Sequence, residues 1–146
     1  QGQIKNYLGR ISKPLLDRID IFTETIILKY GEISNSDKGE NSYNVRKRIE
    51  KVHHIQKERY KNDGILFNSE LSAGMIKRYC VMDNEAKEYL ENIFENMEFS
   101  ARAYHKVLKT ARTIADMDES GEIKRKHISE AVCYRTADKK YWGVTM

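Results

Sequence analysis

The sequence is poor in the residues that mark several classes of protein. Its 146 residues include one proline and two cysteines, and no apolar run approaches the ~18 residues needed to span a membrane. Cys80 and Cys133 form no CxxC motif and no metal-ligand set, and the apolar helical pattern around each predicts a reduced thiol in the core of a cytoplasmic protein. We therefore expect no membrane span and no metal site.

The sequence also lacks the glycine-rich phosphate loop G-x-x-x-x-G-K-[ST]. Because that loop supplies the backbone N–H groups that cradle phosphates, these residues by themselves are expected to have no ATPase activity and at best weak affinity for nucleotide. The N-terminus carries neither an initiator methionine nor the apolar core of a signal peptide. We expect the chain to be a fragment of a longer protein.

Charge, in contrast, is abundant and unevenly distributed. A third of the residues are charged, and the formal net charge is +4. Residues 45–63 carry seven Lys or Arg against three Asp or Glu, whereas residues 64–100 carry three against seven. A basic surface is one requirement of nucleic-acid binding, but oppositely charged neighbouring helices explain the same pattern more simply.

The first 43 residues predict a small region of mixed structure. A short helix is expected at 3–9, and Ser12 with Pro14 marks the start of another. Residues 19–28 are β-branched and apolar on both faces, which predicts a strand from a sheet covered on both sides. No second strand of similar quality follows, so its partners would lie outside this chain or in a second copy. The small polar residues 31–43 predict a flexible linker.

The remainder of the chain predicts a helical bundle. Helices are expected over 45–60, 73–80, 84–97, 101–117 and 128–135, with N-caps at Ser72, at Asp83 or Asn84, and at Ser100. The segment 101–117 has the clearest apolar stripe, formed by Tyr104, Val107, Leu108, Ala111, Ile114 and Ala115.

Arg102 lies in the first turn of that expected helix, where the helix dipole mildly disfavours a cation. Either Arg102 is an ordinary solvated arginine, or an anion outside the helix holds it there. From the residues alone, the sequence predicts a basic helical module and no particular role.

Two long motifs then give the chain a family resemblance. I-S-K-P-L-L-D-R-I-D over 11–20 and F-S-A-R-A-Y-H-K-V-L-K-T-A-R-T-I-A-D over 99–116 resemble the magnesium-chelatase-like AAA+ ATPases, in the bacterial branch of the competence protein M type. The segments V-R-K-R-I-E-K-V-H-H-I-Q-K-E-R-Y over 45–60 and H-I-S-E-A-V-C-Y-R over 127–135 fall where that family has its first and last lid helices. The resemblance covers essentially the whole chain.

The resemblance implies a fold and a division into domains. Residues 1–30 would be the C-terminal end of an α/β ATPase core, residues 31–43 a flexible linker, and residues 44–146 the all-α, helical-bundle lid domain. The Walker motifs of the core would precede Gln1.

The resemblance also implies two site residues. Arg18, in L-L-D-R-I-D, falls at the arginine-finger position, which reaches the ATP of a neighbouring subunit in a hexameric-type ring. Arg102, in S-A-R, falls at the second-sensor position, which contacts nucleotide from the lid, of its own subunit or of the neighbouring one. The structural alternatives are a salt bridge from Arg18 to Asp17 or Asp20 and a solvated Arg102.

Two further arginines, Arg10 and Arg112, are weaker site candidates and are more typical of structural arginines.

In the full-length protein the resemblance implies ATP and Mg²⁺, assembly with copies of itself into a ring, DNA as one candidate partner, and a cytoplasmic location. It leaves open three functions. They are a DNA-remodelling or helicase-like motor, which the 99–116 motif favours, a metal-insertion motor as in magnesium chelatase, and a helical interaction module without ATP.

Overall fold

The elements of the described part of the chain are helices. A computed structural model describes residues 10–25, 27, 30–31, 39–97 and 99–142. Its elements are α2 (Lys13–Leu16), α4 (Ser42–Tyr60), the 3₁₀ helix η1 (Asn68–Glu70), α5 (Ala73–Tyr79), α6 (Asn84–Met97), α7 (Ala101–Met117) and α8 (Arg125–Trp142). No strand occurs among the described residues, and the predicted all-α class is confirmed. Within those ranges no helix combines the length and apolarity that crossing a membrane requires.

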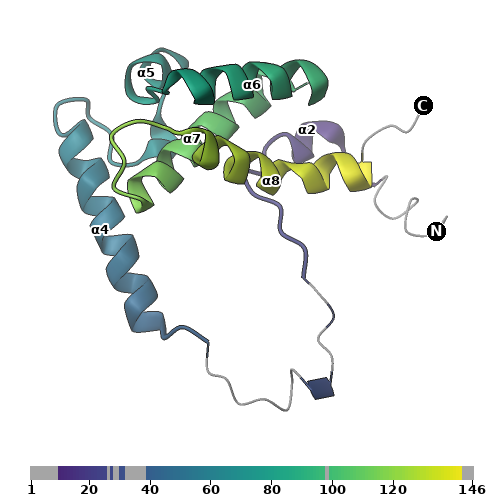
Figure 1. Cartoon of the computed structure of the whole chain (residues 1–146), viewed down its shortest axis with the longest axis horizontal. Coiled ribbons are helices and arrows are strands. Elements are labelled where there is room, and N and C mark those ends of the chain that lie inside the picture. Colours follow the sequence, from purple (N-terminus) through teal and green to yellow (C-terminus); the bar gives the residue numbers. More distant parts are fainter. Residues whose placement is uncertain (1–9, 26, 28–29, 32–38, 98, 143–146) are drawn as a thin grey trace.

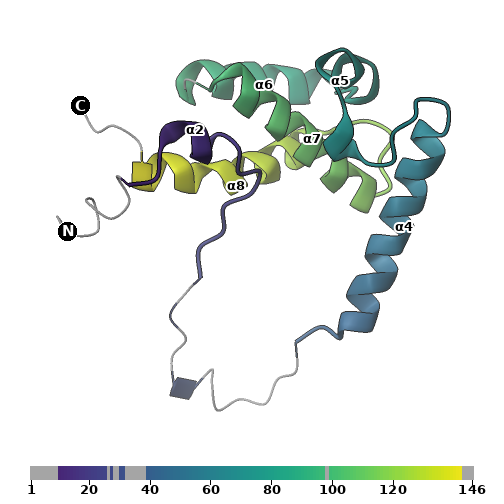
Figure 2. The ribbon, with the colours of Figure 1, turned by 180° about the vertical axis from the view of Figure 1, so that it is seen from behind.

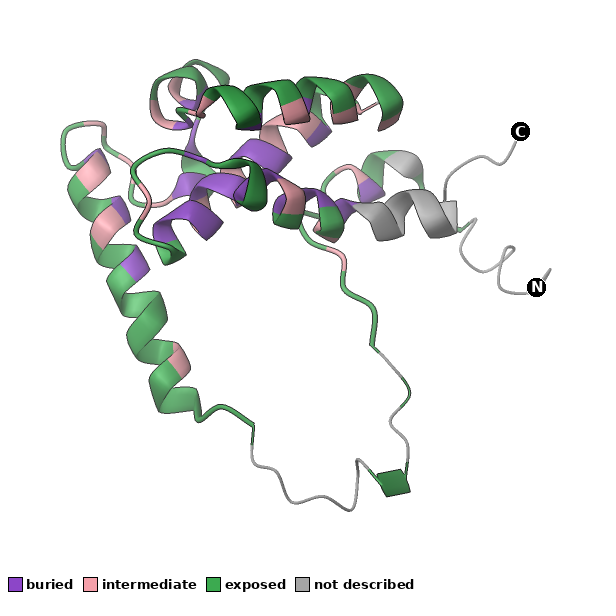
Figure 3. Ribbon diagram, viewed as in Figure 1, coloured by how far each residue is buried: buried purple, intermediate pink, exposed green. Residues whose placement is uncertain are grey.

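Helix α7 is the centre of the bundle. It packs against α8, α4, α5 and η1, and Figure 3 shows buried residues concentrated along it. The predicted stripe faces this core, because Val107, Leu108, Ala111, Ile114 and Ala115 are buried and Tyr104 is half-buried. The core therefore forms around the segment that has the clearest amphipathic pattern in the sequence.

The predicted N-caps are confirmed as helix starts. A side-chain oxygen accepts a backbone N–H at the start of α5 (Ser72 from Met75, 3.4 Å), α6 (Asp83 from Ala86, 2.7 Å) and α7 (Ser100 from Ala103, 3.1 Å). Each cap satisfies one N–H that has no partner within its helix. Asn41 caps α4 in the same way, so α4 begins three residues before the expected position 45.

A short bridge joins two of the connections between helices. Met82 and Ile123 pair as an isolated parallel β-bridge. The Ile123 N–H donates to the carbonyl of Val81 at 2.8 Å, and the Asp83 N–H donates to the carbonyl of Ile123 at 3.2 Å. Because Ile123 is fully buried, the bridge fixes the segments before α6 and α8 against the core.

The strand expected at 19–28 is not formed by the described residues of that segment. Residues 19–25 and 27 belong to neither helix nor strand. A strand needs a neighbouring strand for its backbone groups, and the described chain offers none. Instead the segment follows α2, which lies beside α8 in both views (Figures 1 and 2), and the Phe22 N–H donates to the carbonyl of Tyr134 in α8 at 2.9 Å. The helix expected at 3–9 lies outside the described residues.

Helix α8 corrects two expectations. It runs to Trp142 rather than ending near Arg135, since neither glycine nor proline interrupts residues 125–142. Cys133 is exposed, so it is not a core thiol, whereas Cys80 is buried as expected. The buried positions Ile128, Ala131 and Val132 lie on one side of α8. Cys133, one residue after Val132, lies on a different side of the helix.

The two thiols should therefore react very differently. Burial raises the pKa of Cys80 to about 11, so roughly 0.1% of it is thiolate at pH 8, and thiolate is the reactive form. Iodoacetamide at pH 8 should modify the exposed Cys133 rapidly and leave Cys80 untouched until the protein unfolds. Peptide mass spectrometry over a time course measures both rates, and equal rates would contradict the buried position of Cys80.

Candidate nucleotide-contacting site

Arg102 lies at the exposed N-terminus of α7. It is the second residue of the helix, its side chain is exposed, and no acidic residue occupies the first turn. None of the ion pairs between described residues includes Arg102. A guanidinium beside the N–H groups of a helix start is well suited to contact an anion such as a phosphate.

Arg18 lies in the turn that follows α2, and its side chain is also exposed. Its backbone N–H donates to the carbonyl of Leu15 at 2.9 Å, and the Ile19 N–H donates to the carbonyl of Leu16 at 3.1 Å. Neither alternative salt bridge, to Asp17 or to Asp20, is among the ion pairs of the described residues, and the Asp20 carboxylate pairs with Lys106 at 2.8 Å. These hydrogen bonds fix the backbone at Arg18. None of the ion pairs between described residues involves its guanidinium.

The structure joins the segments that carry these two arginines. Lys106 is one helical turn after Arg102 on α7, and its partner Asp20 is two residues after Arg18. The two guanidiniums therefore project from neighbouring parts of one scaffold. Arg10, the weaker candidate, is exposed in the turn ahead of α2.

Arg112, the other weaker candidate, is a structural residue. It is 1% exposed, and its guanidinium donates to the carbonyls of Gly121 at 2.8 Å and Ser120 at 2.5 Å. Its Nε donates to Asp116 Oδ1 at 3.1 Å. Arg112 therefore holds the turn after α7 and has no free face for a ligand.

Asp116 is the centre of a buried polar network that sequence reasoning missed. Its carboxylate accepts a bidentate pair of hydrogen bonds from Arg59 of α4 and the hydrogen bond from Arg112 Nε. It also accepts a 2.9 Å hydrogen bond from the side chain of Asn68 in η1. Burial is the largest single influence on Arg59 and lowers its pKa, but the contributions of Asp116 and Tyr60 together outweigh burial and raise that pKa. Two guanidiniums around one carboxylate thus tie α4, η1 and the end of α7 together.

Asn68 extends this network toward α4. Its side chain also donates to Thr113 at 2.9 Å and accepts from the Tyr60 hydroxyl at 2.6 Å, while its backbone N–H donates to Gln56 at 3.1 Å. In the sequence, only the i, i+4 spacing of Arg112 and Asp116 beside the apolar stripe indicates this network. Their partners in α4 and η1 come together only in the fold.

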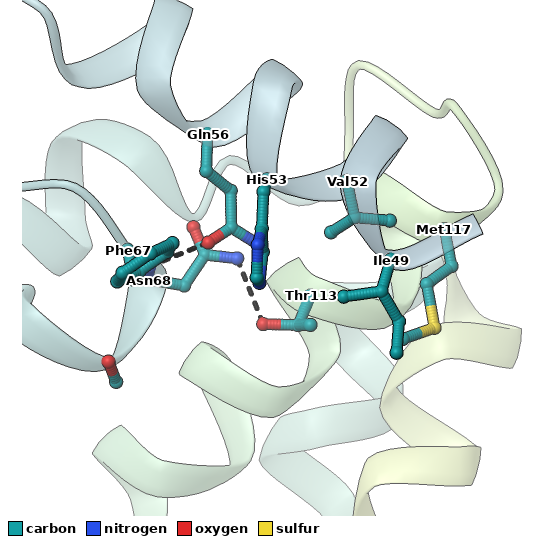
Figure 4. Close-up of a pocket in the computed structure, with 9 residues that line it drawn as sticks. Ile49, Val52, His53, Gln56, Phe67, Asn68, Thr113 and Met117 are labelled. Carbon is teal, nitrogen blue, oxygen red and sulfur yellow. Dashed lines mark hydrogen bonds between the residues drawn. The ribbon is translucent and has the colours of Figure 1, made fainter. Parts of the chain in front are cut away.

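A pocket of about 270 Å³ opens above this network, between α4, η1 and α7 (Figure 4). Figure 4 shows the side chains of Ile49, His53, Phe67 and Met117 around it, with hydrogen bonds from Asn68 to Gln56 and Thr113 at its base. It lies at the opposite end of α7 from Arg102, since Thr113 is roughly 16 Å further along the helix axis. The pocket is therefore separate from the predicted arginine site. Among the described residues, no cluster of three His, Cys, Asp or Glu is placed to hold a metal ion.

Comparisons with known proteins find relatives for most of the chain. Residues 39–135 match the family described as magnesium chelatase, subunit ChlI C-terminal. Competence protein ComM of Haemophilus influenzae is 39% identical over 134 residues, which cover 91% of this chain and 26% of that protein. An uncharacterized protein, YifB, of Salmonella typhimurium is 38% identical over 138 residues, covering 94% of this chain and 26% of the relative.

A more distant relative, the uncharacterized protein Rv2897c of Mycobacterium tuberculosis, is 29% identical over 113 residues, covering 77% of this chain and 22% of its own length. The chain thus spans about a quarter of the length of the curated relatives it matches. The match over 39–135 and the likeness to ComM and YifB show that this chain belongs to the magnesium-chelatase-like AAA+ family, in the branch of competence protein ComM.

Proposed function

We propose that this chain is the lid and arginine-finger region of a ring-forming AAA+ ATPase. Residues 1–30 would end the ATPase core, residues 31–43 would link it to the lid, and residues 44–146 would form the lid. The full-length protein would bind ATP and Mg²⁺ with residues outside this chain, assemble with copies of itself, and act in the cytoplasm. Support comes from the family and from Arg18 and Arg102, which are exposed on joined segments.

The observation that carries this proposal is the position of Arg102. A cation in the first turn of a helix opposes the helix dipole, yet here it is exposed beside a capped N-terminus with no acidic neighbour in that turn. The γ-phosphate of ATP would supply the missing anion. Arg18 would complete the site from the adjacent subunit, because a planar, permanently charged guanidinium suits the charge that develops on a transferring phosphoryl group.

Replacing Arg102 with Ala in the full-length protein should weaken ATP binding and the coupling of lid motion to nucleotide. Arg102→Lys should restore function only in part, because an ammonium lacks the bidentate fork of guanidinium. Isothermal titration with a non-hydrolysable ATP analogue and Mg²⁺ measures the affinity, and thermal unfolding checks the fold. An Arg102→Ala protein with unchanged affinity would refute the nucleotide role, and one with a collapsed melting temperature would assign Arg102 a structural role.

The substrate of the motor is a second question. We propose DNA, since the similarity to competence protein ComM extends over almost the whole chain. The family description, which mentions magnesium chelatase, favours a metal-insertion motor as the alternative. The ATPase rate of the full-length protein with single-stranded or branched DNA, compared with the rate with a porphyrin-chelating partner complex, separates the two.

A further inference from the structure

Arg135 is a buried cation at the point where α8 meets the segment that carries Arg18. It is 2% exposed, its Nη1 donates to the carbonyl of Ile19, and its guanidinium lies 5.3 Å from the ring centroid of Phe22. A guanidinium can use its edge for hydrogen bonds and its face for an aromatic ring at the same time. One buried side chain therefore holds this segment at two points.

Two further contacts hold the same segment. The Phe22 N–H donates to the carbonyl of Tyr134, next to Arg135, at 2.9 Å. Lys106 of α7, whose side chain is 15% exposed, pairs with Asp20 at 2.8 Å. We call residues 17–22 the finger segment, and the contacts made to it by Arg135, Tyr134 and Lys106 the clasp.

The backbone is held on both sides of Arg18, by Leu16 before it and by the clasp after it. Before it, Leu16 is 2% exposed and anchors α2 in the bundle. After it, the carbonyl of Ile19 is bound by Arg135. The Arg18 side chain nevertheless stays exposed. A fixed backbone with a projecting guanidinium is the preorganised arrangement that an arginine needs to stabilise charge in a transition state.

We propose that Arg135 and Lys106 are positioning residues for Arg18. Arg135 couples the finger segment to α8 and Lys106 couples it to α7, so that Arg18 and Arg102 move as one body. This rests on the proposed function of Arg18. Lys106 lies four residues after Arg102 on the same face of α7, so a displacement of α7 at the nucleotide is transmitted to Asp20. Nucleotide sensing by one arginine would thereby reposition the other.

Amide hydrogen exchange tests the clasp without any ATPase measurement. Arg135→Met should speed exchange of the Phe22 amide at least ~10-fold, since a buried hydrogen bond from a charged group is lost. Arg125→Met is the matched control, because Arg125 is on the same helix but makes an exposed pair with Glu85. The control should leave the Phe22 amide unchanged, and the core amide of Ala111 should stay protected in both variants.

A second variant tests the clasp independently, in case the Arg135→Met protein does not fold. Phe22→Leu keeps an apolar side chain and the backbone N–H at position 22 but removes the ring under the Arg135 guanidinium. In this variant the amide at position 22 should also exchange faster, while the amide of Ala111 stays protected. A wild-type Phe22 amide that exchanges as fast as an unstructured peptide, or one that is unaffected by either substitution, would overturn the clasp.

A double-mutant cycle in the full-length ATPase tests the positioning role. Arg135→Met should lower kcat at least ~10-fold with little change in KM for ATP, and Arg18→Ala with Arg135→Met should be no slower than Arg18→Ala alone. Losses that multiply would overturn the inference, because Arg135 would then act independently of Arg18. If Arg18→Ala itself turns over normally, the proposed finger fails while the exchange result still stands.

Discussion

Replacing Arg18 with Ala in the full-length protein should reduce ATP turnover by at least ~100-fold and leave ATP binding nearly intact. Arginine fingers of other NTPases contribute about 10³–10⁵ in rate, because the guanidinium stabilises charge that develops on the phosphoryl oxygens in the transition state. Arg18 is exposed and paired with no described carboxylate, so its removal should not destabilise the bundle. Steady-state ATPase assays and nucleotide titration measure the two effects.

Mixed rings distinguish a finger from an ordinary surface arginine. Since a finger acts on the nucleotide of the neighbouring subunit, wild-type subunits should restore part of the activity when mixed with Arg18→Ala subunits. Arg10→Ala is the control, because Arg10 is exposed on the same N-terminal segment. Normal turnover in Arg18→Ala, or equal losses in the two variants, would remove the finger assignment.

Replacing Asp116 with Ala should give the largest loss of stability of any single change in the bundle, about 3–5 kcal/mol. The carboxylate is fully buried between Arg59 and Arg112, so its removal leaves two cations without their counter-charge. Urea unfolding of the chain measures the free energy. Glu119→Gln is the control, since the Lys51–Glu119 pair is exposed and contributes at most about 1 kcal/mol.

The network also predicts non-additive energetics. Arg112→Leu combined with Asp116→Leu should cost less than the sum of the two single changes, because the double variant removes a charge together with its partner. The remaining guanidinium of Arg59 is partly exposed and can reach water. Additive losses would show that Arg112 and Asp116 stabilise the bundle independently.

The helices were predictable because each is specified by residues close together in the sequence. Ser72 and Ser100 cap the helices that follow them, and the apolar stripe of 101–117 marks the side that faces the core. A strand cannot be specified in this way. Residues 19–28 have strand-like side chains, but a strand also needs a paired neighbour. Among the described residues of this segment, the Phe22 N–H instead donates to the carbonyl of Tyr134 in α8.

The position of Arg102 was predictable from its motif, and the clasp and the buried network were not. Arg135 is one charged residue in a helix rich in charge, and only the fold places it against Ile19 and Phe22. Likewise, the excess of positive charge over 45–63 suggested pairing with 64–100, whereas Lys51 and Arg59 pair with Glu119 and Asp116 near the end of α7. Charge counts give the sign of a segment, but partners depend on packing.

The first half of α4 extends beyond the bundle, and this makes α4 a spacer. From Ser42 to Glu50 every residue except Val45 is exposed, and the buried positions begin at Val52 (Figure 3). Apart from Ile49, which lines the pocket with Met117, this half relies on local contacts, namely the Asn41 cap, the bidentate Arg48–Glu40 pair at 2.8 and 3.0 Å, and Lys47 over the ring of Tyr43. Its rise of roughly 13 Å sets how far the chain before Asn41 is held from the core. Adding or deleting whole turns here would change that reach without repacking a single core residue.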